Sequence, residues 1–447
     1  MLEIAVKALE LTAGLGVDEA EAFAMINSSL KVKVYRQEVE ELASTTGSGV
    51  GIRVFKDKSV GYAYTSDLSD DSLVATAKAA VENAAVAVRD EFVGLPEPSS
   101  EFSDVDLYSE EVEKYPVAGK IEIARLVERA SLERDPRINQ VDTATYAEGE
   151  GQVAIANSLG FGREYRESTC YIFVQAIAEQ NGEMQTGVSF ATGRDPGQLD
   201  GAACGAEAAD RATALLGATQ CNSMSCPVVA DPFVTASLLG VIGSALTGEA
   251  VQKQRSMFAG LEGGEVASNA VRLADDGTHP DGLSSAPFDG EGVPTRETLL
   301  IENGVLQAFL YDAYSGRKDR RPSTGNGMRG SYHSMPHVGA TNLRLLGGTA
   351  SFEEMVASVN LGIYVTDVSG MHSGANPVSG DFSVGATGRL IKGGELSEPV
   401  REITIAGNLL AILKSIQTVG ADSRWVPFGG SVQAPSILIG EMTVSGK

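Results

Sequence analysis

The chain has 447 residues and a formal net charge of −24, from 59 acidic and 35 basic residues. The negative electrostatic field of such a chain repels nucleic-acid phosphates and anionic lipid surfaces, so we expect neither a nucleic-acid nor a membrane partner. No apolar run reaches the length of about 18 residues that a membrane helix needs. The start, Met1 to Ile4, lacks the basic region of a signal peptide, which predicts a cytoplasmic protein.

The first half of the chain alternates helical and strand patterns. Its predicted helices are amphipathic or Ala-rich and cover 1–14, 70–88, 117–133 and 196–216. Its predicted strands are short, and polar residues or turns separate them: 20–26, 30–35, 50–55, 60–65, 138–148, 151–157 and 170–180. Residues 94–116 are rich in proline, serine and acids without periodicity, which predicts a linker or surface loop.

A change of character near residues 217–225 predicts a domain boundary. We therefore expect an N-terminal α+β domain over 1–220, with a candidate sub-boundary near 94–116, and a C-terminal β-rich domain over 221–447. In the second domain Asp231 is a good N-cap, Pro232 suits the first helical position, and apolar residues follow to Leu246. This helix is apolar on nearly all sides, so it is predicted to be buried. The fold class is thus α+β, with a mixed helix/sheet N-terminal half and a β-rich C-terminal half packed on a buried helix.

Cysteine and histidine spacings give little support for a metal site. Cys221 and Cys226 have a separation that no common zinc site uses, so buried free thiols are favoured over a structural metal. His333 and His337 are four residues apart, but Pro336 forbids a regular helix between them, which favours surface or sheet histidines over metal ligands. The sequence contains no Gly-x-Ser-x-Gly nucleophile elbow and no Walker A or dinucleotide-binding motif.

An ordered set of short motifs resembles the TldD/PmbA family, whose members have been described as modulators of DNA gyrase. In the second half the motifs are 264–268, 274–278, 288–295, 300–306, 311–312 and 323–329. In the first half they are 49–55 and 61–63, followed by an acidic turn and an Ala-rich helix. Each motif is weak alone, and the order of the set carries the resemblance over nearly the whole chain.

The resemblance implies a degenerate metal site at 248–253. Active members of the family resemble metallopeptidases with an HExxxH segment and a later cysteine, which would hold zinc, with the glutamate as general base. Here Gly248 and Lys253 stand at the histidine positions and Phe428 at the cysteine position, whereas the glutamate remains as Glu249. Glu249 is the one weak catalytic candidate, and no zinc is expected on this chain. The C-terminal motifs match the PmbA (TldE) branch more closely than the TldD branch.

Glu249 and Lys253 are four residues apart, the spacing of a helix ion pair. We favour a structural pair; the alternative is that Lys253 replaces the charge of the metal and keeps Glu249 ionised. If only the ligands are lacking, a Gly248→His, Lys253→His, Phe428→Cys variant should fold and bind zinc weakly. By resemblance, Asn326 and Arg329 are expected to line a peptide-binding cavity.

The resemblance implies a dimer that encloses a cavity for unfolded peptides. The principal hypothesis is a non-catalytic subunit of a cytoplasmic TldD/TldE-type metallopeptidase acting on unfolded or modified peptides, with zinc on a TldD-type catalytic partner. One alternative is a homodimeric peptide-binding module without protease activity. Another is an enzyme with an unrecognised site.

Overall fold

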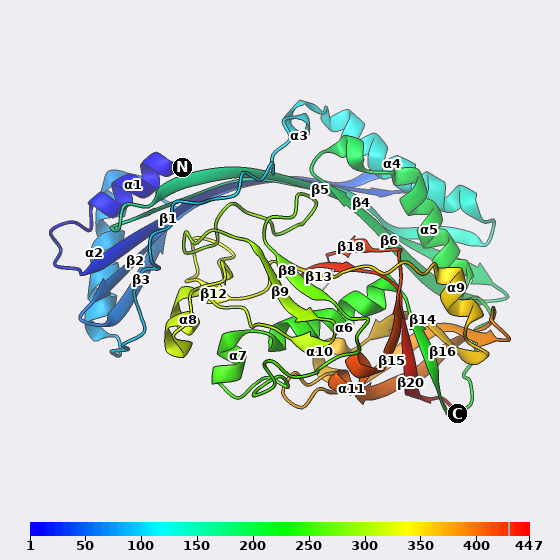
Figure 1. Cartoon of the computed structure of the whole chain (residues 1–447). Coiled ribbons are helices and arrows are strands. Elements are labelled where there is room, and N and C mark those ends of the chain that lie inside the picture. The colour runs from blue at the N-terminus through cyan, green and yellow to red at the C-terminus, as the bar shows by residue number, and fades with distance from the viewer. Residues whose placement is uncertain (428–429) are drawn as a thin grey trace.

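A long antiparallel sheet dominates the first half of the computed structural model, which describes residues 1–427 and 430–447. Its strands follow the order β3-β2-β1-β4-β5-β6. They are β1 (Glu19–Tyr35), β2 (Glu38–Lys56), β3 (Ser59–Thr65), β4 (Ile138–Asn157), β5 (Gly162–Gln180) and β6 (Glu183–Gly193). The sheet arches over the C-terminal half, with helices on its outer, convex side (Figure 1).

The beginning of β1 is buried on both faces because its two sets of alternating side chains meet different partners. Ala22 and Ala24 pack against the apolar side chains of α1 (Leu2–Glu10) and α2 (Asp70–Val86). Phe23 lies on the opposite face, in a cluster that includes Phe288 of the C-terminal half. The two halves of the molecule are therefore packed directly on each other here.

Several predicted strands are parts of longer ones. Residues 20–26 and 30–35 belong to the single strand β1, because Asn27 and Ser28 between them pair with β2 on one side and β4 on the other. The same pairings join 138–148 and 151–157 into β4. Ladder hydrogen bonds from two neighbours thus override the local turn preference of the polar residues.

The second group of helices covers the other end of the sheet. It contains α3 (Glu111–Lys114), α4 (Val117–Arg134) and α5 (Gly201–Thr213), the last preceded by a 3₁₀ turn at Pro196–Gln198. Glu128 of α4 is 1% exposed, and its carboxylate accepts hydrogen bonds from the backbone N–H groups of Arg36 and Gln37, both 2.6 Å. Both of these residues have positive φ, so α4 holds the tight turn between β1 and β2.

Two sheets of six strands build most of the C-terminal half, in the orders β10-β9-β8-β13-β19-β18 and β16-β15-β14-β7-β20-β17, with a further β16–β20 pairing. The first comprises β8 (Leu273–Asp276), β9 (Glu297–Glu302), β10 (Val305–Leu306), β13 (Asn342–Leu345), β18 (Arg424–Val426) and β19 (Ser431–Ala434). The second comprises β7 (Met224–Ala230), β14 (Leu361–Ser369), β15 (Asp381–Lys392), β16 (Glu395–Asn408), β17 (Ile416–Val419) and β20 (Ile437–Ser445). The remaining elements are α7 (Gly248–Gln252), α8 (Ala313–Asp319), β11 (Gly327–Met328), β12 (His337–Val338), α9 (Phe352–Ala357), α10 (Met371–Gly374) and α11 (Leu409–Ser415).

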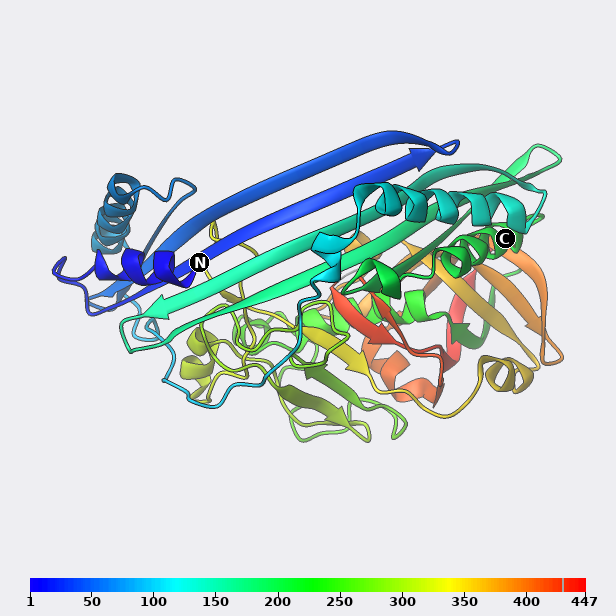
Figure 2. The ribbon, with the colours of Figure 1, turned by 90° about the horizontal axis from the view of Figure 1, so that it is seen from above.

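The helix α6 (Pro232–Ala245) contacts strands of both C-terminal sheets, and its apolar side chains belong to the largest core cluster. This confirms the predicted α+β class, with a β-rich half packed on a buried helix. Figure 2 shows the long sheet from above, with α4 and α5 lying over its strands and the C-terminal half beneath it. None of the helices in the described residues is long and apolar enough to cross a membrane.

Candidate functional site

The buried helix α6 begins where the sequence predicts, at an N-cap that also belongs to a polar network. The Asp231 carboxylate accepts a hydrogen bond from the backbone N–H of Phe233, 2.9 Å away. It also accepts from the Arg211 guanidinium at 2.9 Å and from the Tyr364 hydroxyl at 2.6 Å. These three bonds fix the helix start on α5 and β14, so the direction in which α6 points is set at its first turn.

The segment 248–253 does not continue α6. The backbone at Leu246 and Gly248 turns aside to bond with Leu310, with N···O distances of 2.9 and 2.8 Å. Thr247 then caps a separate short helix, α7, by accepting a hydrogen bond from the backbone N–H of Ala250. The segment 248–253 is therefore placed by its pairing with the strand-like segment around residue 310.

The first histidine position is filled from another part of the chain. A Cβ atom added to Gly248 would overlap the ring of Tyr311 at Cε1 and Cδ1. Tyr311 is 4% exposed, and its hydroxyl donates to Asp319 at 3.0 Å. Burial, followed by this hydrogen bond, raises the pKa of Tyr311 to about 12. A neutral, anchored phenol ring therefore stands where a ligand at position 248 would have to project.

The second of the two expected histidine positions, residue 253, holds a cation that is already paired. The Lys253 ammonium lies 2.7 Å from a carboxylate oxygen of Glu249, with side chains 51% and 40% exposed respectively. The predicted i,i+4 pair is thus confirmed. An ammonium has no free lone pair for a metal, and here it is neutralised by the Glu249 carboxylate. The residues at 248 and 253 do not fit a zinc ion. Phe428, at the cysteine position, lies outside the described residues.

We expect the Glu249–Lys253 pair to contribute little to folding, because solvent screens half-exposed charges. Lys253→Ala should lower the free energy of unfolding by about 0.2–0.5 kcal/mol. Urea denaturation at low and high salt measures this, and the difference from the parent should shrink at high salt. A salt-independent loss of several kcal/mol would show that the pair is a structural anchor.

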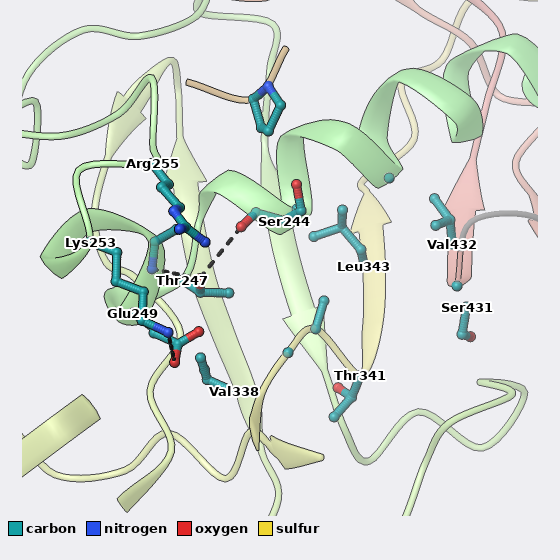
Figure 3. Close-up of a pocket in the computed structure, with 17 residues that line it drawn as sticks. Ser244, Thr247, Glu249, Lys253, Arg255, Val338, Thr341, Leu343, Ser431 and Val432 are labelled. Atoms are coloured by element: carbon teal, nitrogen blue, oxygen red, sulfur yellow. Dashed lines mark hydrogen bonds and ion pairs between the residues drawn. The ribbon is translucent and has the colours of Figure 1, made fainter. Parts of the chain in front are cut away.

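A cavity of about 420 Å³ lies beside this segment, between α6, α7 and β13 (Figure 3). Its charged lining residues are Glu249, Lys253 and Arg255. Across from them lie side chains of Thr341, Leu343, Ser431 and Val432. The sequence singled out Glu249 and Lys253, and it missed Arg255, which lies just beyond the motif.

The histidines and cysteines occupy separate environments. Cys221 and Cys226 are buried free thiols, as predicted, and burial raises the pKa of Cys226 to about 11. His333 stacks on Tyr64 with ring centroids 4.8 Å apart, while His337 is an exposed residue of β12. Within residues 1–427 and 430–447, no three His, Cys, Asp or Glu side chains are grouped so that they could hold a metal ion.

Asn326 and Arg329 are buried inside the chain, which differs from the expectation that they line a cavity. Asn326 is 2% exposed, and its amide donates to the Asp275 carboxylate at 2.7 Å and to the carbonyl of Gly339 at 3.0 Å. The Arg329 side chain is 0% exposed and lies 2.7 Å from the carboxylate of Glu21. The polar groups that suggested ligand contacts instead hold loops and domains in place.

Arg329 belongs to a buried ionic network that joins the two halves and that no local sequence signal reveals. The Glu21 carboxylate of β1 accepts a hydrogen bond from the Arg329 guanidinium and another, at 2.9 Å, from the Arg53 guanidinium of β2. The Arg53 guanidinium also lies 3.2 Å from the carboxylate of Glu291. Burial by itself would raise the pKa of Glu21, but Arg53 and Arg329 outweigh it and hold this pKa below its usual value. Burial and the neighbouring Glu291 raise the pKa of Asp289 beside the network.

An arched six-stranded sheet above a body with two six-stranded sheets is the fold of known proteins. A crystal structure of a candidate modulator of a DNA gyrase from Thermotoga maritima superposes with a TM-score of 0.91 at 30% identity, covering 99% of each chain. The structure of TldE from Thermococcus kodakarensis superposes with a TM-score of 0.90 at 24% identity, covering 98% of this chain and 100% of that one.

Sequence comparison gives the family. Models of the PmbA/TldA metallopeptidase match at residues 20–84 (domain 1), 110–216 (central domain) and 223–446 (C-terminal domain). The metalloprotease PmbA of Escherichia coli O157:H7 is 30% identical over 452 residues, covering 100% of this chain and 96% of that protein. A metalloprotease TldD homologue of Haemophilus influenzae is 27% identical over 89% of this chain and 86% of its own. The chain belongs to the PmbA/TldD metallopeptidase family.

Proposed function

We propose that this chain is the non-catalytic, TldE/PmbA-like subunit of a cytoplasmic TldD/TldE-type metallopeptidase acting on unfolded or modified peptides. The observation that carries the proposal is the filled ligand position: the Tyr311 ring occupies the space into which a side chain at Gly248 would project. At the other position, the Lys253 ammonium is bound to Glu249. Hydrolysis by this family's chemistry needs a metal that activates water, so zinc would reside on a TldD-type partner.

The open edge of the long sheet supports an association with another chain. Strand β3 pairs only with residues 50–56 of β2, so residues 38–49 have no strand on that side in the described part of the chain. Val39 and Leu42 on this stretch are 37% and 53% exposed. An exposed edge of this length offers backbone donors and acceptors to an added strand, from a partner subunit or from an extended peptide.

The same edge favours the second candidate, a homodimeric peptide-binding module without protease activity. A second copy of the chain could add its own β2 edge in place of a different partner. The two candidates differ in what accompanies the chain in the cell and in where the metal lies.

Co-purification from the source cell, with metal analysis of each species, tests the proposal. We expect a complex with a second, HExxxH-containing chain that carries about one zinc per heterodimer, and this chain prepared alone should retain no stoichiometric zinc after dialysis. Light scattering should report a mass near that of two chains. A tightly held zinc on this chain alone would refute the non-catalytic assignment. Recovery of only a zinc-free homodimer would favour the binding module.

A further inference from the structure

The cavity beside α7 is locally positive in a strongly acidic chain. Its three charged lining residues are Glu249, Lys253 and Arg255, which give it a formal charge of +1. The whole chain carries −24. In a concave site partly shielded from solvent, a local reversal of sign selects for an anionic ligand and repels cationic ones.

Arg255 supplies the available cation. In the described part of the chain, it makes no ion pair or side-chain hydrogen bond, whereas Lys253 is held by Glu249. The backbone at Arg255 is nevertheless fixed. Its N–H donates to the carbonyl of Ala250 at 2.7 Å, and Gln254 before it has a φ of 55°, which together end α7 in a Schellman-type turn. The chain accepts a left-handed residue that is not glycine and thereby places Arg255 at the cavity.

The opposite wall is apolar or uncharged. Leu343 and Val432 contribute apolar surface on this wall (Figure 3), and Val338 and Pro377 are further apolar residues of the lining. The hydroxyl groups of Thr341 and Ser431 are already committed, to Asp275 and Asn342 at 2.8 and 2.6 Å. A volume of about 420 Å³ is at the small end of ligand pockets and suits a terminal residue rather than a long segment.

We propose that this cavity binds the carboxylate of a peptide, with its terminal α-carboxylate on the Arg255 guanidinium and its last side chain against Leu343 and Val432. Arginine presents a planar pair of N–H donors that matches a carboxylate, and the apolar wall accepts the adjacent side chain. The identification of the ligand as a peptide rests on the proposed function. The anionic character of the ligand rests on the lining residues alone.

Glu249 opposes this ligand in two ways. Its carboxylate neutralises Lys253, at 2.7 Å, and adds a negative charge to the cavity wall. Replacing Glu249 by glutamine removes that charge and releases the Lys253 ammonium. The site therefore predicts effects of opposite sign: Arg255→Gln weakens binding, and Glu249→Gln strengthens it. A purely structural role for these exposed residues would not produce a gain.

The test uses the purified full chain and fluorescein-labelled Gly-Gly-Ser-Gly-Ala-Leu, as the free acid and as the C-terminal amide, followed by fluorescence anisotropy. We expect amidation and Arg255→Gln each to weaken binding about tenfold. Glu249→Gln should tighten binding of the free acid about threefold and leave the amide unchanged. Arg320→Gln is the matched control, since Arg320 is exposed and lies outside the cavity lining.

Two further probes separate the sources of the carboxylate. An amidated peptide ending in Asp-Leu that binds as well as the free acid assigns the ligand group to an acidic side chain and supports the carboxylate site. Inorganic phosphate that competes at millimolar concentration also supports it. Equal binding of acid and amide, or insensitivity to both Arg255→Gln and Glu249→Gln, overturns it. Because these measurements use the chain alone, they remain decisive even if co-purification finds no catalytic partner.

Discussion

Replacing Arg329 with methionine is expected to lower the free energy of unfolding by roughly 3–5 kcal/mol, because it leaves Glu21 buried with one of its two cations removed. Both side chains are 0% exposed, and the pair spans 308 residues of sequence. The loss includes the packing of the guanidinium on the ring of Phe23, 4.6 Å from its centroid. Chemical denaturation followed by circular dichroism measures the change.

The matched control is Arg134→Met. Arg134 pairs with Asp210 at 2.8 Å, but the two side chains are 52% and 53% exposed. Solvent screens this pair, so its removal should cost only about 0–1 kcal/mol. In a double-mutant cycle, Glu21→Gln combined with Arg329→Met should cost less than the sum of the single losses. Equal losses for Arg329→Met and Arg134→Met would show that the buried network does not hold the two halves together.

The second large effect is expected at Gly248. Gly248→Ala should destabilise the fold by about 1–3 kcal/mol, because its Cβ has to displace the anchored ring of Tyr311. Gly248→His should cost more, since imidazole is larger. Gly330→Ala is the control, because a Cβ at Gly330 meets no atom within 4 Å. Thermal and urea denaturation of the three variants decide the comparison.

A double variant at Gly248 and Tyr311 tests whether side chains at these two positions compete for the same space. Tyr311→Ala alone should be costly, roughly 3–5 kcal/mol, because it empties a buried site. Combined with Gly248→His, the loss should be smaller, since the imidazole fills part of the same space. The structure therefore revises the expectation that Gly248→His, Lys253→His and Phe428→Cys together give a folded zinc-binding chain. Tyr311 has to be replaced by a smaller residue as well, because its ring occupies the space of a side chain at position 248. Additive losses at 248 and 311 would contradict the overlap.

Sequence information was sufficient where the determinants are local. The start of α6 follows from Asp231 and Pro232, two adjacent residues whose capping preferences need no tertiary partner. The ion pair of Glu249 and Lys253 follows from a spacing of four residues on one short helix. The family resemblance, carried by ordered motifs over the whole chain, gave the fold class.

Features that depend on distant partners could not be predicted in this way. After α6 ends at Ala245, hydrogen bonds of Leu246 and Gly248 with Leu310 set the course of the chain, and nothing in the adjacent sequence indicates this distant partner. Asn326 sits in a motif that suggests a binding loop, but its amide is satisfied by Asp275, a residue 51 positions away. Arg255 lines the cavity because Gln254 adopts a left-handed conformation. Glutamine rarely adopts this conformation, so the sequence does not indicate it.

The strand order of the arched sheet sets a constraint on how the chain folds during synthesis. Strand β1 pairs on one side with β2, the next strand in the sequence, but its other edge is completed only by β4, which ends at Asn157. The backbone N–H groups of Arg36 and Gln37, in the turn between β1 and β2, likewise find their carboxylate acceptor only in the later residue Glu128. Until the ribosome has released these later residues, an edge containing Ala22, Phe23 and Ala24 stays unpaired in the nascent chain. We therefore expect the pairing of β4 with β1 to be the slow, non-local step in folding this half.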